Sequence, residues 1–187
     1  MLSHNLFGAP TVRCGDGVVT LDFEADAYSC RYDPVDRDPD ASAEPLVPSW
    51  RDATEADDRL ETGDRRLFLR AWGTALPSYF RKPMRSLMIA ALRLDEEPVR
   101  RSTASVQDLA ARFERMSLYL PYRAPCLLRA YILLHYLSFY GRRADWIIGV
   151  QLFPFRAHCW LAAGDLLIGE RSHLIEEYVP IFRLRQS

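Results

Sequence analysis

The sequence predicts an α+β fold in which a small β-rich N-terminal region and a helical middle precede a helix packed on an antiparallel sheet. Short runs of alternating apolar residues lie at the two ends of the chain, in 11–32 and 145–184. Apolar residues at helical spacing dominate much of the segment between them. The chain has 187 residues, 49% of them hydrophobic, so it is long and apolar enough to bury a core.

The N-terminal run predicts a three-stranded antiparallel sheet. Residues 12–14 and 18–23 fit the two strands of a hairpin, because Gly15-Asp16-Gly17 between them is a turn sequence. Residues 27–32 follow a short acidic turn and form the third strand. The next segment, about 33–50, is acidic and broken by prolines, which predicts a solvated linker.

Helices are expected in the middle of the chain, between the linker and residue 118. Residues 52–72 have helical spacing, and Gly63 could separate two helices there. Residues 84–92 form an apolar helix. Another begins at Ser105, which is suited to be its N-cap with Asp108 in the first turn.

The C-terminal half begins with an almost wholly apolar helix over 126–140, closed by Gly141. A helix that is apolar on all sides is expected to be buried on all sides. Antiparallel strands are expected over 145–153, 156–163, 166–168 and 178–184.

Composition excludes several classes of function. A net charge of −1 gives no support for binding nucleic acid or an anionic membrane. The longest apolar stretch, 144–155, is too short and too polar to cross a bilayer. The N-terminus lacks the features of a signal peptide, so we expect a cytoplasmic protein with no membrane partner.

A candidate thiol site is the most informative feature of the chain. Pro125 suits the first turn of a helix, and Cys126 follows it where free backbone N–H groups and the helix dipole stabilise a thiolate. His158 lies on a predicted strand and could accept the thiol proton. A cysteine at a helix start followed by a histidine on a strand is the layout of papain- and transglutaminase-type sites.

A third residue should orient the imidazole by accepting its other N–H. Asp165, in the Gly164-Asp165 turn, and Glu170, after the next short strand, are the two candidates. An antiparallel hairpin that turns at 164–165 brings residues near Glu170 alongside His158, so geometry favours Glu170.

Zinc binding by Cys126, His158 and Cys159 is the competing chemical use of these residues. Strand alternation should place Cys159 on the face opposite His158, so that only one of them can join Cys126. No fourth ligand has suitable spacing, and we therefore expect no metal.

The motif around these residues resembles a known family. Residues 125–130 (PCLLRA), 148–150 (IGV) and 154–160 (PFRAHCW) are similar to the lasso-peptide B protein, the leader peptidase of the microcin-processing type. The resemblance covers roughly 119–170. The family pattern usually reads Ala-His-Ala-Trp, where this chain has Cys159, and it usually has aspartate where this chain has Glu170.

The resemblance implies a transglutaminase-like (papain-like) cysteine endopeptidase core with a Cys-His-acid triad. Its function would be to remove the leader of a ribosomally made lasso precursor before the macrolactam is closed. It further implies a partner, an asparagine-synthetase-like cyclase that uses ATP, while the chain itself would bind no cofactor.

The N-terminal strands resemble the peptide-recognition element of such pathways, similar to the peptide chaperone of pyrroloquinoline quinone biosynthesis. That element binds a leader peptide by adding it as a strand to a sheet edge. The resemblance implies a leader-recognition region over 1–95 and a peptidase domain over 96–187. The expected leader-binding residues are Val18, Val19, Leu21, Phe23 and Tyr28.

Two other functions remain open on the sequence. One is a leader-binding maturation scaffold without catalysis, which a glutamate at position 170 would favour. The other is a transglutaminase-like acyl transferase.

Overall fold

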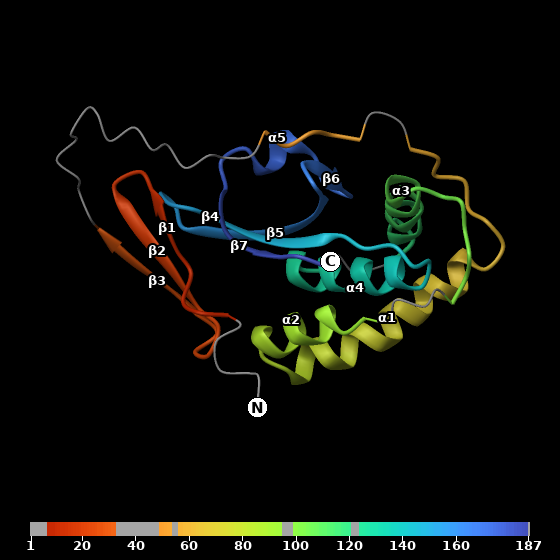
Figure 1. Ribbon diagram of the computed structural model, residues 1–187, viewed down its shortest axis with the longest axis horizontal. Coiled ribbons are helices and arrows are strands. Elements are labelled where there is room, and N and C mark those ends of the chain that lie inside the picture. Colours follow the sequence, from red (N-terminus) through yellow and green to blue (C-terminus); the bar gives the residue numbers. More distant parts are fainter. Residues whose placement is uncertain (1–6, 33–48, 54–55, 95–98, 121–123, 187) are drawn as a thin grey trace.

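The computed structural model describes residues 7–32, 49–53, 56–94, 99–120 and 124–186 (Figure 1). It contains two antiparallel sheets with helices between them along the chain, which confirms the α+β fold. The N-terminal sheet consists of β1 (Thr11–Cys14), β2 (Gly17–Asp22) and β3 (Ala27–Tyr32). The helices are α1 (Asp64–Arg81), α2 (Met84–Leu92), α3 (Val106–Ser117), α4 (Cys126–Ser138) and α5 (Ser172–Ile175). The C-terminal sheet consists of β4 (Asp145–Gln151), β5 (Arg156–Ala163), β6 (Leu166–Ile168) and β7 (Val179–Leu184).

The N-terminal sheet has the strand order β1-β2-β3, as the hairpin pattern predicted. Its central strand β2 pairs with both neighbours, Val19 lying opposite Val12 on one side and Cys30 on the other. The turn into β3 is fixed by Asp22, whose carboxylate accepts hydrogen bonds from the backbone N–H groups of Glu24 and Ala25 at 2.8 and 3.0 Å. Most of the predicted linker, 33–48, lies outside the described residues.

The helix prediction for 52–72 is wrong in its first half. The described residues before Gly63 are not helical, and α1 begins at Asp64 and continues to Arg81 with Pro77 inside it. Gly63 adopts a φ of 98°, a left-handed conformation that glycine favours, and so precedes the helix instead of separating two helices. The predictions for α2 and α3 are confirmed, including the Ser105–Asp108 capping box.

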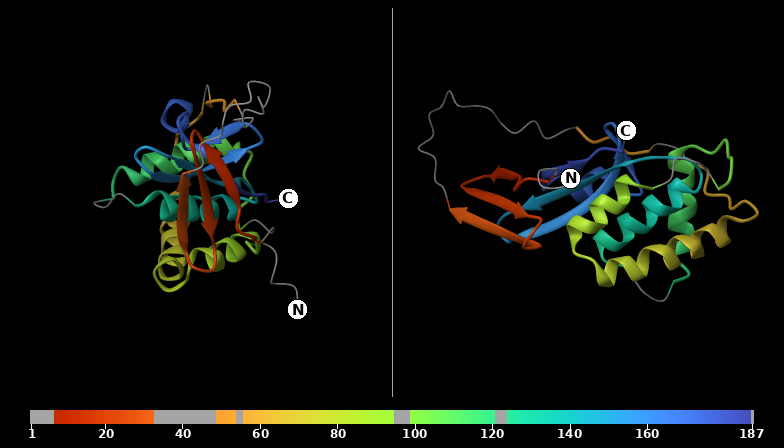
Figure 2. Two further views of the ribbon diagram at one scale, coloured as in Figure 1. Left: turned by 90° about the vertical axis from the view of Figure 1, so that its left-hand side faces the viewer. Right: turned by 60° about the horizontal axis from the view of Figure 1, so that its bottom comes forward.

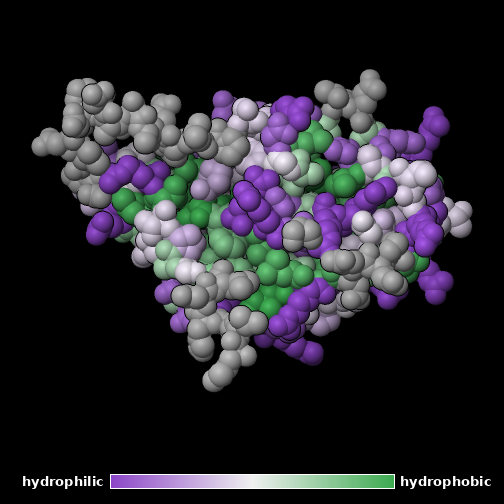
Figure 3. Space-filling model, in the orientation of Figure 1, coloured by the Kyte–Doolittle hydropathy of each residue, from purple (hydrophilic) through white to green (hydrophobic). Residues whose placement is uncertain are grey.

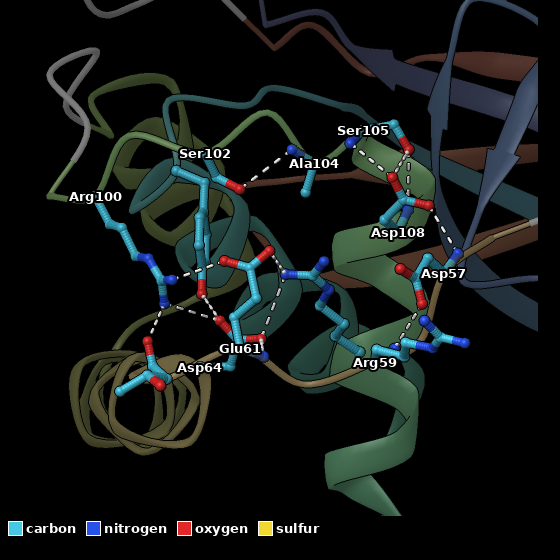
Figure 4. Close-up of polar contacts among 12 residues, drawn as sticks. Asp57, Arg59, Glu61, Asp64, Arg100, Ser102, Ala104, Ser105 and Asp108 are labelled. Atoms are coloured by element: carbon cyan, nitrogen blue, oxygen red, sulfur yellow. Dashed lines mark hydrogen bonds and ion pairs between the residues drawn. The ribbon is translucent and has the colours of Figure 1, made fainter.

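Ion pairs explain why the charged segment before α1 is not helical (Figure 4). Asp64 is fully buried and its carboxylate lies 3.2 Å from Arg100, while Glu61 lies 2.8 Å from Arg112 of α3. The hydroxyl of Tyr140 also donates a hydrogen bond to Asp64 at 2.6 Å. These tertiary partners outweigh the weak helical preference of the local sequence, and they join 57–64 to α3 and the end of α4.

The C-terminal sheet has the strand order β6-β5-β4-β7, and α4 packs on one of its faces. Figures 1 and 2 show α4 between the sheet and α1. Most residues of α4 are buried, as its apolar sequence predicted, and Gly141 follows the end of the helix. The opposite face of the sheet carries a second, smaller apolar cluster, made of Trp50, Ile147, Trp160, Ala162, Leu167, Ile175 and Tyr178.

The N-terminal sheet packs against one end of the C-terminal sheet (Figure 2). The rings of Phe7 and Phe23 lie 5.6 and 4.8 Å from that of Phe182 on β7. Tyr28 of β3 contacts Phe155, at the start of β5, with ring centroids 5.4 Å apart. Both α1 and α2 pack against α4, and the division into 1–95 and 96–187 stays a prediction.

Figure 3 shows hydrophobic residues gathered on the surface around α2, in the middle of this face, with hydrophilic residues around them. The helix is rich in methionine, leucine and alanine, and only part of it is buried. Among the described residues, none of the helices combines the length and the hydrophobicity needed to cross a membrane.

Candidate active site

Cys126 is the first residue of α4, and Pro125 precedes it as the N-cap residue. The N–H groups in the first turn of a helix have no partner within the helix, and they lie where the helix dipole is positive. The thiol is half-buried, so it is partly shielded from water and still accessible to a reactant. The sequence therefore places Cys126 where a thiolate and a developing oxyanion are both stabilised.

His158 lies on β5 opposite Gly149 of β4. Its ring packs between two aromatic side chains, with centroids 6.1 Å from Trp160 and 5.5 Å from Tyr178. Gly149 makes room for this arrangement, because a Cβ added there would lie 2.5 Å from the indole ring of Trp160. The backbone of β4 thus allows Trp160 and His158 to pack closely, which fixes the orientation of the imidazole.

Glu170 orients the same imidazole. Its Oε2 lies 3.0 Å from Nε2 of His158, and its side chain is only 10% exposed. Its Oε1 accepts a hydrogen bond from the backbone N–H of Arg171 at 3.2 Å. Because Nε2 is occupied by Glu170, Nδ1 is the nitrogen left to face Cys126.

The other candidate, Asp165, is not brought to His158. It is exposed and accepts two hydrogen bonds from Arg51, at 2.6 and 2.8 Å. It follows Ala163, the last residue of β5, which lies five residues beyond His158 and therefore roughly 16 Å further along the strand. Asp165 therefore belongs to the turn between β5 and β6, where it binds Arg51.

The electrostatics of the site favour a thiolate–imidazolium pair. A side-chain hydrogen bond from Cys159 is the largest cause that lowers the pKa of Cys126 from 9.0 to about 4, and the hydrogen bond with His158 adds to it, while burial opposes both. Burial also opposes the charged form of His158. The hydrogen bonds to Cys126 and Glu170 nevertheless raise the pKa of His158 from 6.5 to about 9.

The expectation that only His158 could join Cys126 is wrong. Both His158 and Cys159, the latter through its side chain and its backbone N–H, lower the pKa of the Cys126 thiol. Strand alternation does separate the two side chains, because Cys159 belongs to the core that packs on α4. The start of α4 nevertheless belongs to a helix that packs on β5, so residues on either face of that strand can influence Cys126.

Arg129 is a further residue of the site, and its role was not predicted from the sequence. Its guanidinium donates to the carbonyl of Gly169 at 2.7 Å and lies 2.7 Å from Glu114 and 3.8 Å from Glu170. It follows Cys126 by three residues on α4, so a charged residue one turn from the thiol in an apolar helix was the available signal. A cavity of about 600 Å³ opens beside Arg129 and Glu170.

The expected leader-binding residues divide into two groups. Val19, Leu21 and Phe23 are buried, and the backbone of β2 already pairs on both sides, so these residues support the sheet from within. Val18 is half-buried. Tyr28 lies on β3 near the thiol site: burial, followed by the nearby Cys159 and Cys126, raises its pKa to about 12.

The edge of the N-terminal sheet is open on one side. In the described part of the chain, β3 pairs only with β2. Its side chains are mostly exposed. Among the described residues, no second strand pairs with this edge, and strand addition requires such an edge.

A metal site is not formed by the same residues. Within the described ranges, no three His, Cys, Asp or Glu side chains are grouped so that they could hold a metal ion. What the geometry provides is a nucleophile, a proton acceptor and an acid that orients it.

A comparison with protein families agrees with this geometry. The profile of the transglutaminase-like superfamily matches residues 72–183, which is more than half of the chain and includes Cys126, His158 and Glu170. No curated protein and no solved structure matches the chain. The extent of the family match shows that the chain belongs to the transglutaminase-like superfamily.

Proposed function

We propose that the protein is a cysteine peptidase that binds and removes the leader of a ribosomally made lasso precursor peptide. Membership of the transglutaminase-like superfamily indicates cysteine peptidase or acyl-transfer chemistry. The observation that carries the proposal is the hydrogen-bonded pair His158–Glu170, together with the effect of His158 in lowering the pKa of Cys126 at the start of α4. The lasso-specific part rests on the resemblance of 125–130 and 154–160 to the B-protein motif.

In the first chemical step, the thiolate of Cys126 attacks the carbonyl carbon of the scissile bond. Backbone N–H groups in the first turn of α4 stabilise the oxyanion. His158, protonated at Nδ1, gives its proton to the leaving amine, which releases the C-terminal product. Glu170 keeps the imidazole oriented through Nε2 and balances its positive charge.

In the second step, water hydrolyses the thioester. Neutral His158 takes a proton from the water, which attacks the acyl carbon and releases the leader with a free carboxylate. The imidazolium–thiolate pair is then restored. The reaction needs only groups that α4, β5 and the segment after β6 supply.

The leader is expected to bind as an added strand on β3. The open edge of β3 supplies the backbone hydrogen-bonding groups, and the buried side chains of Val19 and Leu21 hold the sheet in place behind it. Tyr28 connects the two regions, because it lies on β3 and contacts Phe155, three residues before His158. A macrolactam-forming, ATP-using cyclase is the expected partner that receives the cleaved peptide.

The test is mass spectrometry of a lasso precursor peptide after incubation with the protein, a lasso cyclase and ATP. We expect the wild type to cleave one bond and Cys126→Ala to cleave none. Asp165→Asn is the matched control, since Asp165 is exposed, pairs with Arg51 and is not brought to His158. Binding of the leader by both proteins with cleavage by neither would contradict the peptidase and favour a scaffold.

Acyl transfer is the second candidate function, and the superfamily match supports it as well as it supports a peptidase. The same thioester would then be attacked by an amine instead of water. Addition of a primary amine to the assay separates the two, because a transferase gives an amide-linked product in place of the free leader carboxylate.

A further inference from the structure

Residues 50–52 pair with β6, the strand at one edge of the C-terminal sheet (Figure 1). Arg51 forms a parallel bridge with Leu166. The backbone N–H of Arg51 donates to the carbonyl of Asp165, and its carbonyl accepts from the N–H of Leu167, both at 2.9 Å. The side chains of Arg51 and Asp165 form an ion pair as well. The backbone of this segment is therefore anchored on the sheet, and the proposed mechanism does not use it.

Asp52 holds the segment that carries Glu170. Its Oδ1 accepts the backbone N–H of Ser172 at 2.6 Å, and its Oδ2 accepts the hydroxyl of the same residue at 3.1 Å. Ser172 is the first residue of α5, where a backbone N–H has no partner within the helix. Glu170 lies two residues earlier, and its Oε1 accepts from the N–H of Arg171. Asp52 therefore fixes the backbone close to the point from which the acid reaches His158.

Trp50 supports the aromatic packing on His158. Its ring meets that of Trp160 edge to face, with centroids 5.8 Å apart, and Trp160 stacks on His158 at 6.1 Å. Trp160 is only 2% exposed, and Trp50 packs against the apolar cluster to which it belongs. Aromatic pairs of this geometry contribute more than the burial of their area alone. The position of the imidazole therefore depends in part on Trp50.

We propose that residues 50–52 position the catalytic pair of His158 and Glu170, by one contact on the acid segment and one on the aromatic support of the histidine. Both contacts come from one short segment with an anchored backbone, so they hold the two partners relative to each other. The positioning stands apart from any substrate. The claim that it sets the rate of cleavage rests on the proposed function.

The protonation of His158 reports whether the pair is held in place. Burial lowers the pKa of His158, but the neighbouring Cys126 and Glu170 outweigh it and raise the pKa to about 9. Tyr178 also faces the ring, and Arg129 contacts Glu170. These four side chains are intact in every strand-edge variant below, so a fall of the pKa from about 9 toward 6.5 reports a loss of geometry.

The direct test is an NMR titration of the histidine ring signals in the full chain, with His158→Gln used to assign the signal. Ser172→Pro removes both donors that Asp52 accepts, while the charge of Asp52 stays and proline suits the first position of a helix. Trp50→Leu removes the ring contact without a change of charge. We expect both variants to lower the pKa of His158 by on the order of one unit, the spread that protein environments commonly produce. An unchanged titration in both would overturn the proposal.

Asp145→Ala is the matched control. The carboxylate of Asp145 also accepts a backbone N–H from another segment, that of Gln186 at 3.1 Å, and it pairs with Arg183. Asp145 is the first residue of β4, roughly 13 Å along the strand from Gly149, the partner of His158. Its loss should lower the stability of the protein and leave the titration of His158 in place.

Asp52→Ala separates position from charge. It removes a negative charge as well as the contact with Ser172, and either loss lowers the pKa of His158. A shift in Asp52→Ala with none in Ser172→Pro or Trp50→Leu would mean that charge alone acts, which also overturns the proposal.

Trp50→Phe is the conservative variant. Within the described residues the indole N–H of Trp50 has no hydrogen-bond partner, so phenylalanine keeps the part of the side chain that makes the contact. Its titration should match that of the wild type. Thermal unfolding of every variant shows which of them are folded at the temperature of the titration.

Cleavage of the precursor peptide provides the functional arm. In Ser172→Pro and Trp50→Leu we expect kcat to fall by up to roughly 10²-fold, the effect that a misplacement of about 1 Å can have. Leader affinity should stay at the wild-type value, because β3 is untouched.

The two proposals can fail separately. If the titration of His158 shifts as expected but the wild type cleaves no precursor, residues 50–52 position the pair and the peptidase proposal is wrong. If the wild type cleaves and the titration stays in place in the variants, the peptidase proposal stands and residues 50–52 only cover the edge of the sheet.

Discussion

The two antiparallel sheets of this protein expose different parts of the chain for function. In the C-terminal sheet, side chains carry the chemistry: His158 extends from β5 and is held by aromatic neighbours. In the N-terminal sheet, the large apolar side chains of β2 are buried, and β3 is an edge strand that pairs only with β2 within the described residues. The function of the C-terminal sheet should therefore depend on the identity of single side chains, whereas the function of the N-terminal sheet should depend on an intact edge strand.

The largest expected effect is the loss of cleavage without a loss of leader binding. Cys126→Ala should lower the rate of cleavage by a factor on the order of 10⁴ or more, because the nucleophile is removed. Leader affinity should stay at the wild-type value, since β3 is untouched. Fluorescence anisotropy of a labelled leader and mass spectrometry of the cleavage products measure the two quantities on the same protein. A parallel loss of both would show that the regions are not separable.

The reverse experiment acts on the N-terminal sheet. Leu21→Ala removes a fully buried side chain from β2 and should lower the free energy of unfolding by about 2–5 kcal/mol. Leader binding should weaken with it, because β3 loses its support. Urea unfolding gives the stability, and the rate of Cys126 alkylation by iodoacetamide reports whether the thiol site is intact. An unchanged leader affinity at this loss of stability would argue against β3 as the binding edge.

Glu170→Gln tests the acid that holds His158. The variant should lower kcat/KM by roughly 10²-fold, in the range expected when a proton-transfer group loses its orientation. Leader affinity should not change. Asp165→Asn is the matched control: Asp165 is exposed and paired with Arg51, so its loss should leave the cleavage rate unchanged. A larger effect at Asp165 than at Glu170 would reverse the assignment of the third residue.

The pH profile of cleavage sharpens the same comparison. The active pair forms as pH rises through the lowered pKa of Cys126, about 4, and is lost as pH rises through the raised pKa of His158, about 9. A bell-shaped kcat/KM with limbs near these values is therefore expected. In Glu170→Gln the imidazolium loses its carboxylate partner, so its pKa falls and the alkaline limb moves to lower pH. An alkaline limb that stays in place would show that Glu170 does not act on His158.

The smallest expected effect concerns Tyr28, which joins the two sheets. Tyr28→Phe keeps the ring contact with Phe155 and removes only the hydroxyl near the thiols. Cleavage should change by less than about tenfold, since the loss of one typical hydrogen-bonding group contributes 0.5–1.5 kcal/mol. Tyr28→Ala, which also removes the packing, should have the larger effect. Equal effects of the two variants would assign the role of Tyr28 to its hydroxyl.

Much of the fold was predictable because local patterns determine it. The hairpin at 11–22, the capped start of α3 and the apolar α4 each depend on residues within a few positions of one another. The segment before α1 was mispredicted because its charged residues bind Arg100 and Arg112, which are distant in the sequence. The local spacing of apolar residues in 52–72 carries no information about these distant arginines.

The candidate site shows the same limit. The layout of papain- and transglutaminase-type sites predicted the pairing of Cys126 with His158, and hairpin geometry predicted that Glu170 lies beside His158. The influence of Cys159 on the pKa of Cys126 could not be predicted, because strand alternation says which face a side chain occupies and not how near a helix end lies to the strand. Arg129 was missed for a related reason: three of its contacts are to residues on other elements.

Arg129 has a mechanical consequence for the site. A single helical turn of α4 carries both the nucleophile, Cys126, and the guanidinium that contacts Glu170 and the carbonyl of Gly169. If α4 slides or tilts relative to the sheet, the segment that bears the acid is drawn along with the thiol. The distance between the Cys126 sulfur and the Glu170 carboxylate is therefore maintained when the core fluctuates. Without the Arg129 contacts, the two groups would move independently.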